Sequence, residues 1–261
     1  MKIELLYNTP LWVCSKAIRR CWASEDKSDT ITVDGQHDYD CIDDTTKIMT
    51  ETLPKIICGD KDKELIERVG NKNKHKSTLE HLVYTFDIDG ISRACLQELA
   101  RHRMASYSVK STRYTLKELK DEKDFVISND DEGLCNLTNE EYESYRESSV
   151  ENYNMLYAYE RAKKYLVFSS NEQIINNSIM SLELLREALQ DGVSNDIAKY
   201  CLPEAYKTSL IMTINARSLQ NFLELRSNKY ALWEIRELAL NIYEAIPEEH
   251  KYLFGESINN D

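Results

Sequence analysis

Residues 175–189 carry an apolar stripe with the spacing of one helix face. Its members are Ile175, Ile179, Leu182, Leu185 and Leu189. We expect this helix to stop at Gly192, because glycine commonly closes a helix in a left-handed conformation. An apolar face of this length has to be covered, so it predicts either an internal core or a subunit interface.

Residues 82–88 show a different period, in which apolar Leu82, Tyr84, Phe86 and Ile88 take every second position. This alternation is typical of a half-buried strand. We expect Gly90 to break the strand, and Ser92 to cap a helix over residues 93–103. We predict further strands over residues 2–7 and 206–215, an extended or looped segment over 105–114, and helices over 10–22, 62–70, 216–226 and 230–246.

Two further signals bear on the helices. Thr138 and Glu141 form a capping box that predicts the start of a long helix ending near Lys164. Gly70 is expected to stop the short helix over residues 62–70. Together the elements predict a single mixed α/β domain over residues 1–261, with a small, mainly antiparallel sheet flanked by long helices.

Two stretches are expected to elaborate this domain. Residues 23–47 are polar and rich in aspartate, so we interpret them as a surface excursion without a function of its own. Residues 117–195 are expected to form a variable helical insert.

The chain is acidic, with a formal net charge of −12. This charge disfavours general binding to nucleic acid, which requires the neutralisation of many phosphates. The seven cysteines are scattered, odd in number and without a CxxC pair, so we expect reduced thiols, no metal site and a cytoplasmic protein. There is no apolar run of membrane-spanning length and no signal-peptide pattern, so we expect no membrane partner.

Positive charge is nevertheless concentrated in residues 93–117. This window contains six lysines and arginines and a single acidic residue, Glu98. A helix C-terminus would account for Arg101 and Arg103 only. The chain has seven glycines and none of them forms a phosphate-binding loop, so a bound phosphate would have to be held by side-chain cations. Arginines interleaved with serines suit a nucleotide, which carries a phosphate together with other polar atoms.

Three other patterns have both a structural and a functional interpretation. Ser111 lacks the surroundings of an activated nucleophile, so we favour a hydrogen-bonding role for it. Ser77 and Glu80 fit a capping box, flanked by histidines that lack metal-ligand spacing. Arg217 and Asn221 would project from one face of a helix, a pattern that is usually a solvated surface.

Three ordered motifs join these stretches. The first is Arg101-His102-Arg103, then seven residues, then Ser111. The second is HxSxxEH, over residues 75–81, and the third is NARSLxNFLxLR, over residues 215–226. In chain order, from residues 75–81 through 101–111 to 215–226, they resemble the signature of the flavin-dependent thymidylate synthase family. The resemblance spans residues 75–226 and fades in 23–60 and 117–195.

The resemblance implies methylation of dUMP to dTMP, with methylenetetrahydrofolate as carbon donor, FAD as hydride carrier and NADPH as reductant. It also implies a homotetramer. By position, the family's flavin contacts fall on His75, Ser77, Arg101, His102, Arg103, Asn215, Arg217 and Asn221. Its dUMP contacts fall on Glu98, Arg101, Ser111, Arg113, Lys199 and Arg226. Arg226 matches the arginine that polarises the pyrimidine, so it is the expected catalytic residue.

The sequence departs from the family pattern at a few of these positions. Val109 stands where a polar residue is usual, and Glu98 stands where glutamine is usual. Lys199 replaces an arginine, which keeps the charge but loses the bidentate fork. The alternative function is a non-catalytic nucleotide- or nucleic-acid-binding module that uses residues 101–114, with Tyr107 and Tyr114 as stacking platforms.

Overall fold

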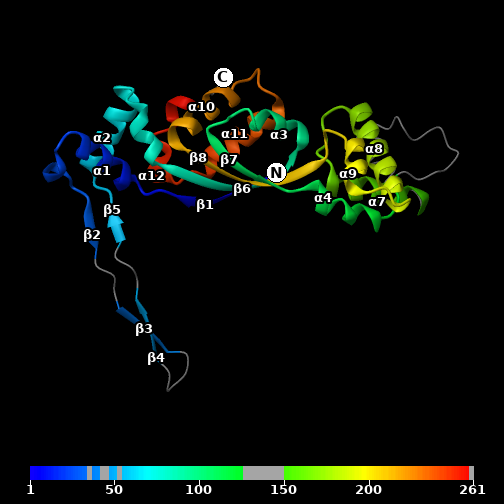
Figure 1. The fold of residues 1–261 in the computed structure, drawn as a ribbon, viewed down its shortest axis with the longest axis horizontal. Coiled ribbons are helices and arrows are strands. Elements are labelled where there is room, and N and C mark those ends of the chain that lie inside the picture. The colour runs from blue at the N-terminus through cyan, green and yellow to red at the C-terminus, as the bar shows by residue number, and fades with distance from the viewer. Residues whose placement is uncertain (34–36, 42–46, 52–54, 126–149, 259–261) are drawn as a thin grey trace. The chain divides into compact units, whose positions relative to one another are not determined.

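The computed structural model describes residues 1–33, 37–41, 47–51, 55–125 and 150–258 (Figure 1). The chain divides into two compact units, which are described separately. Unit 1 comprises Met1–Ile3, Asp87–Arg103 and Tyr107–Met212. Unit 2 comprises Glu4–Phe86, Met104–Ser106 and Thr213–Asp261.

The largest sheet has four strands in the order β1-β6-β8-β7. These strands are β1 (Lys2–Asn8), β6 (Val83–Ser92), β7 (Ala105–Val109) and β8 (Lys207–Asn215). In β8 every second residue is buried, from Thr208 to Ile214, which is the alternation expected of a strand with one covered face. The prediction of an α/β fold with an antiparallel sheet is confirmed.

Two antiparallel pairs lie outside that sheet. Strand β2 (Ile31–Val33) pairs with β5 (Lys55–Ile57), with Ile31 opposite Ile57. Strand β3 (His37–Cys41) pairs with β4 (Lys47–Glu51), with His37 opposite Glu51. The predicted polar excursion over residues 23–47 therefore contains short strands, which the sequence analysis did not predict. The composition of residues 23–47 does not predict these strands, because each strand pairs with residues that lie later in the chain.

Unit 1 is mainly helical. Its helices are α3 (Arg93–Leu99), α4 (Thr112–Thr115), α5 (Lys117–Lys120), α7 (Val150–Tyr165), α8 (Glu172–Gln190), α9 (Asn195–Ala198) and the 3-10 helix η4 (Lys199–Cys201) (Figure 1). The predicted stripe from Ile175 to Leu189 packs into a core with α5, α7 and Tyr206. The stripe is thus an internal core, and each large apolar side chain in it contributes about 1.5–3 kcal/mol by burial. Gly192 follows α8 with φ +87°, which confirms the predicted helix end.

Unit 2 contains the remaining described helices. They are α1 (Leu11–Cys21), η1 (Glu25–Lys27), α2 (Asp60–Ile66), the π-helical η2 (Glu67–Lys72), the 3-10 helix η3 (Lys76–His81), α10 (Ala216–Arg226), α11 (Trp233–Ala245), α12 (Glu248–Lys251) and η5 (Gly255–Ser257). Asp62 is fully buried in α2 and binds Arg19 of α1, at 2.5 Å from Nε, and the hydroxyls of Ser28 and Thr30, at 2.6 Å each. This network anchors the start of the 23–47 segment to two helices.

Three predicted boundaries were wrong. Strand β6 continues through Gly90, which adopts φ +80°, so this glycine permits a local distortion and does not end the strand. Gly70 lies inside η2 and not at a helix end, and it packs closely against Leu79. The helix predicted over residues 93–103 ends at Leu99. The capping box at Thr138 lies outside the described residues, whereas α7 ends at Tyr165, close to the predicted Lys164.

Candidate active site

The Arg101–Arg103 segment is a loop that leaves the C-terminal end of α3. Ser92 caps the start of this helix by accepting a hydrogen bond from the Cys95 amide, at 3.0 Å. At the other end, the Tyr107 hydroxyl lies 3.1 Å from the Leu99 carbonyl oxygen and 2.8 Å from that of His102, and donates toward both. Burial raises the pKa of Tyr107 to about 12, so the hydroxyl keeps its proton. Tyr107 therefore ties the loop back to β7.

The arginines of this loop point to solvent. Arg101 and Arg103 are exposed, and Arg101 Nη1 lies 3.8 Å from Glu98 Oε1. An exposed pair at that distance contributes little stability, so the guanidinium is available to another anion. Val109, which departs from the pattern that the sequence resembles, ends β7 and is exposed.

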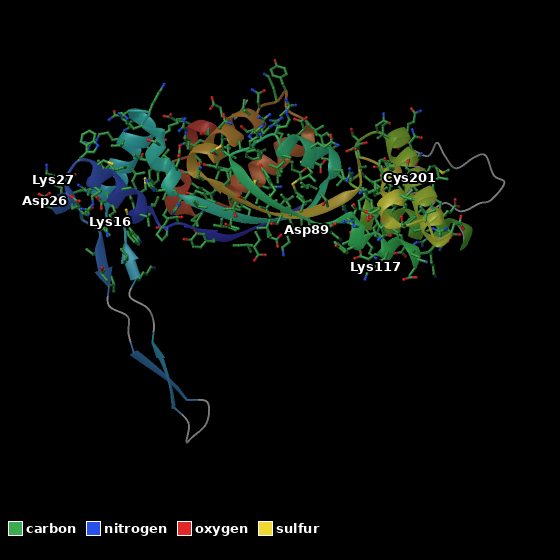
Figure 2. All side chains as sticks on the ribbon, viewed as in Figure 1. Lys16, Asp26, Lys27, Asp89, Lys117 and Cys201 are labelled. Atoms are coloured by element: carbon green, nitrogen blue, oxygen red, sulfur yellow. The ribbon has the colours of Figure 1, made fainter. Side chains whose placement is uncertain are left out.

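A second cationic group lies in the helical part of unit 1, where Lys117 marks α5 and Cys201 marks η4 in Figure 2. Arg113 Nε lies 3.0 Å from Asp196 Oδ1, and Lys199 Nζ lies 3.6 Å from the same oxygen. The Asn195 side chain donates to the Arg113 carbonyl oxygen, at 2.7 Å. Two residues predicted to bind dUMP are thus brought together around one carboxylate.

Sequence reasoning missed both Asn195 and Asp196. The only local signal was that Asp196 precedes Lys199 by three residues, the spacing of neighbours on a helix. Ser111 is exposed at the start of α4, and its side chain makes no capping hydrogen bond to that helix. The hydroxyl is therefore not committed to closing the helix.

In unit 2 the predicted residues lie on two elements. Asn215 ends β8 and caps α10, accepting a hydrogen bond from the Ser218 amide at 2.9 Å. Arg217 and Asn221 follow one turn apart on the exposed face of α10, and Arg226 is its last residue. Arg217 Nη1 binds Glu80 Oε1 of η3 at 2.7 Å. The structure thus joins the second and third sequence motifs directly.

The predicted capping box over Ser77 and Glu80 does not form. The segment is the 3-10 helix η3, with His75 at its N-cap and no capping hydrogen bond from a side chain. Glu80 instead binds Arg217, a partner 137 positions away that no local pattern could reveal. His75 and Ser77 are exposed at the start of η3.

The placement of η3 depends on the turn before it. Lys74 adopts φ 56°, a left-handed conformation that is rare for a residue with a side chain. The amide of His75 donates to the Val69 carbonyl oxygen at 3.0 Å, across this turn. Gly70 is buried beneath Leu79, so close that a Cβ on it would lie 2.7 Å from Leu79 Cδ2. Backbone geometry and close packing together fix the element that carries His75 and Ser77.

Within the described residues, no group of three or more histidine, cysteine, aspartate or glutamate side chains could hold a metal ion. Among the described helices, none is long and apolar enough to cross a membrane.

Known proteins resemble the chain over nearly its whole length. The family described as "Thymidylate synthase complementing protein" matches residues 4–250. The chain belongs to this family. The flavin-dependent thymidylate synthase of Campylobacter jejuni (strain RM1221) is 50% identical over 262 residues, covering 100% of this chain and 99% of that protein. The Wolinella succinogenes enzyme of the same name is 51% identical over 254 residues, covering 97% of each.

A solved structure extends the likeness to the fold. Thymidylate synthase X from Helicobacter pylori, crystallised with FAD and dUMP, superposes with a TM-score of 0.75. The two chains are 42% identical and each is covered completely. The predictions of the family, the fold class and an enzyme with a flavin cofactor are confirmed, and the alternative of a non-catalytic binding module is not favoured.

Proposed function

We propose that this flavin-dependent thymidylate synthase methylates dUMP to dTMP with FAD, taking the carbon from methylenetetrahydrofolate and reducing equivalents from NADPH. The observation that carries the proposal is the convergence of Arg113 and Lys199 on a single carboxylate. Both residues stand at family positions for dUMP, and two cations on one small anion are what a nucleotide phosphate requires. The Helicobacter pylori relative, crystallised with FAD and dUMP, supports the choice of ligands.

The residues proposed for FAD fit its chemistry. FAD carries a diphosphate and a ring edge rich in carbonyl and N–H groups, so it needs cations and side chains that both donate and accept. In unit 2, exposed His75, Ser77, Arg217 and Asn221 offer such groups. The proposed set is completed by Asn215, Arg101, His102 and Arg103. When bound, FAD supplies the hydride for the reduction.

For the substrate, each proposed residue has a separate task. Arg113 and Lys199 would hold the phosphate, and the Ser111 hydroxyl would donate to dUMP without forming a covalent bond. Arg226 would stand beside the uracil and stabilise the negative charge that develops on the ring, the catalytic role. Arginine suits this task because its guanidinium stays protonated. Glu98 and Arg101 complete the proposed dUMP set.

Tritium release from dUMP labelled at the uracil C5 position tests the proposal. Protein supplied with FAD, methylenetetrahydrofolate and NADPH should release tritium and form dTMP, and omission of the folate or NADPH should abolish dTMP formation. Purified protein should be yellow and release FAD on denaturation. A colourless protein that FAD cannot reconstitute would contradict the proposal.

Two substitutions test the roles proposed for Arg113 and Ser111 in dUMP binding. Arg113→Ala should weaken dUMP binding by about 1.5–3 kcal/mol, the scale of a lost charged hydrogen bond. Ser111→Ala should reduce turnover but leave it measurable. Unchanged dUMP affinity in the first variant, or complete loss of turnover with dUMP still bound in the second, would contradict the assigned roles.

The proposal also covers the oligomeric state, cellular location and domain organisation of the enzyme. We propose a homotetramer in the cytoplasm, with residues 1–261 acting as a single functional domain. The buried stripe on α8 is accounted for by the core of unit 1, so it provides no separate support for the tetramer. Size-exclusion chromatography with light scattering measures the assembly.

A further inference from the structure

Asp196 occupies a position that the proposed function leaves unexplained. Its Oδ1 lies 3.0 Å from Arg113 Nε and 3.6 Å from Lys199 Nζ, so one carboxylate oxygen forms an ion pair with both cations. We propose that Asp196 is an internal competitor of the dUMP phosphate and sets how tightly the enzyme holds phosphorylated nucleosides. This inference rests on the proposed function, because it assumes that Arg113 and Lys199 bind the phosphate.

The first step concerns charge. With Asp196 present, the formal charge of the three side chains is +1, and without its carboxylate the charge is +2. A phosphate dianion must therefore either replace the carboxylate on the two cations or bind beside it against like-charge repulsion. Both routes make dUMP binding weaker than the two cations alone would allow.

The second step concerns position, because a carboxylate could also help binding by holding Arg113 in place. The backbone of Arg113 has its own anchor, the Asn195 side chain, which donates to its carbonyl oxygen at 2.7 Å. Arg113 lies in the short helix α4, where backbone amides donate to the carbonyl oxygens of Ser111 and Thr112. Loss of the Asp196 charge should therefore leave the position of the Arg113 backbone unchanged.

The third step concerns strength. The side chains of Arg113, Asp196 and Lys199 are 61%, 51% and 37% exposed, so water and salt screen their interactions. Exposed pairs of this kind are weak and easily exchanged. A competitor held this loosely weakens the phosphate site moderately and does not close it. This weakening of phosphate binding applies to every phosphorylated nucleoside, the product as well as the substrate.

The test is calorimetric titration of the FAD-loaded enzyme with dUMP and with deoxyuridine. Asp196→Asn should tighten dUMP about threefold to tenfold, the range expected for relief of two exposed pairs, and leave deoxyuridine binding unchanged. The KM for dUMP should fall while kcat does not rise, because the carboxylate touches no reacting atom. Raising the salt concentration should weaken dUMP more steeply in the variant, since its site carries more net charge.

Two control variants separate an effect of the Asp196 charge at this position from other effects of the substitution. Asp191→Asn removes the same charge from an exposed residue at the end of α8 and should leave dUMP affinity unchanged. Asp196→Ala should tighten dUMP like Asp196→Asn, which guards against an effect of the new amide. If Arg113→Ala weakens dUMP but neither Asp196 variant tightens it, the inference is overturned and the proposed function stands. If Arg113→Ala also has no effect, the phosphate assignment itself is overturned.

Discussion

Gly70 lies at the packing contact that holds η3, so replacing it tests how the fold supports the proposed flavin residues. In Gly70→Ala the new Cβ would lie 2.7 Å from Leu79 Cδ2, 3.0 Å from Cγ and 3.3 Å from Cδ1. Real Cβ atoms essentially never approach another heavy atom within 3.0 Å, so something has to move. Leu79 is fully buried, so it cannot swing into solvent to make room.

The magnitude follows from two opposing terms. Inserting a methyl group into a well-packed core costs about 1–3 kcal/mol. Exchanging glycine for alanine inside a helical segment recovers at most about 1 kcal/mol. With the full gain subtracted, we expect Gly70→Ala to lower the free energy of unfolding by up to about 2 kcal/mol. Because Leu79 lies in η3 between Ser77 and Glu80, the strain should also displace the proposed flavin contacts.

The assay combines urea denaturation with FAD titration of the same preparation. Gly70→Ala should lower the denaturation midpoint and weaken FAD. The matched control is Gly255→Ala, because a Cβ at Gly255 would meet no atom within 4 Å. If Gly70→Ala is as stable as the control and binds FAD normally, the close packing of Leu79 does not determine the position of η3.

Three further outcomes follow from other contacts. Tyr107→Phe should leave the free energy of unfolding within about 1 kcal/mol of wild type. It should nevertheless weaken FAD, measured by fluorescence titration, because the loop loses its hydroxyl anchor at His102. Arg226→Ala should retain FAD but lose most dTMP formation in single-turnover assays; unchanged turnover would refute its catalytic role. Asp62→Asn should cost about 3 kcal/mol at pH 7, because it leaves Arg19 buried without its charged partner.

The Asp62 variant has a further signature in its pH dependence. Burial raises the pKa of Asp62, but hydrogen bonds from Ser28, Thr30 and Arg19 outweigh it and hold the pKa below the ordinary value. The carboxylate therefore contributes stability above about pH 4, which is lost as the pH falls through its folded-state pKa. Urea denaturation should show the difference from Asp62→Asn shrinking below about pH 4. A difference that is constant with pH would mean that the ionised form is not what stabilises the network.

Elements governed by neighbouring residues could be predicted from the sequence. Helix α10 has the predicted bounds Ala216–Arg226, because Asn215 supplies its N-cap from the adjacent position. The end of α8 was predicted because Gly192 adopts its left-handed conformation within the same turn. In both places the deciding interaction spans only a few residues, so the local sequence contains it.

Interactions across long sequence separations could not be predicted. The local pattern predicts a helix stop at Gly70, because it contains no sign of the packing against Leu79. It predicts a capping box at Glu80, because the partner of Glu80, Arg217, lies on a distant element. Asp196 was missed because its contact with Arg113 depends on α4 and α9 meeting in the fold. The motifs identified the residues, but only the structure identified their partners.

Those partners explain how an acidic chain can maintain cationic sites. Arg217 is paired with Glu80 and Arg113 with Asp196, and all four side chains are more than 40% exposed. Exposed pairs contribute little to stability, so they cannot be what places the arginines. Backbone anchors do that instead: the Asn215 cap places the start of α10, and Asn195 holds the Arg113 carbonyl. Each arginine is therefore held through the backbone of its element and only weakly neutralised at its guanidinium. Under the proposed function, a phosphate replaces the carboxylate without unfolding any element.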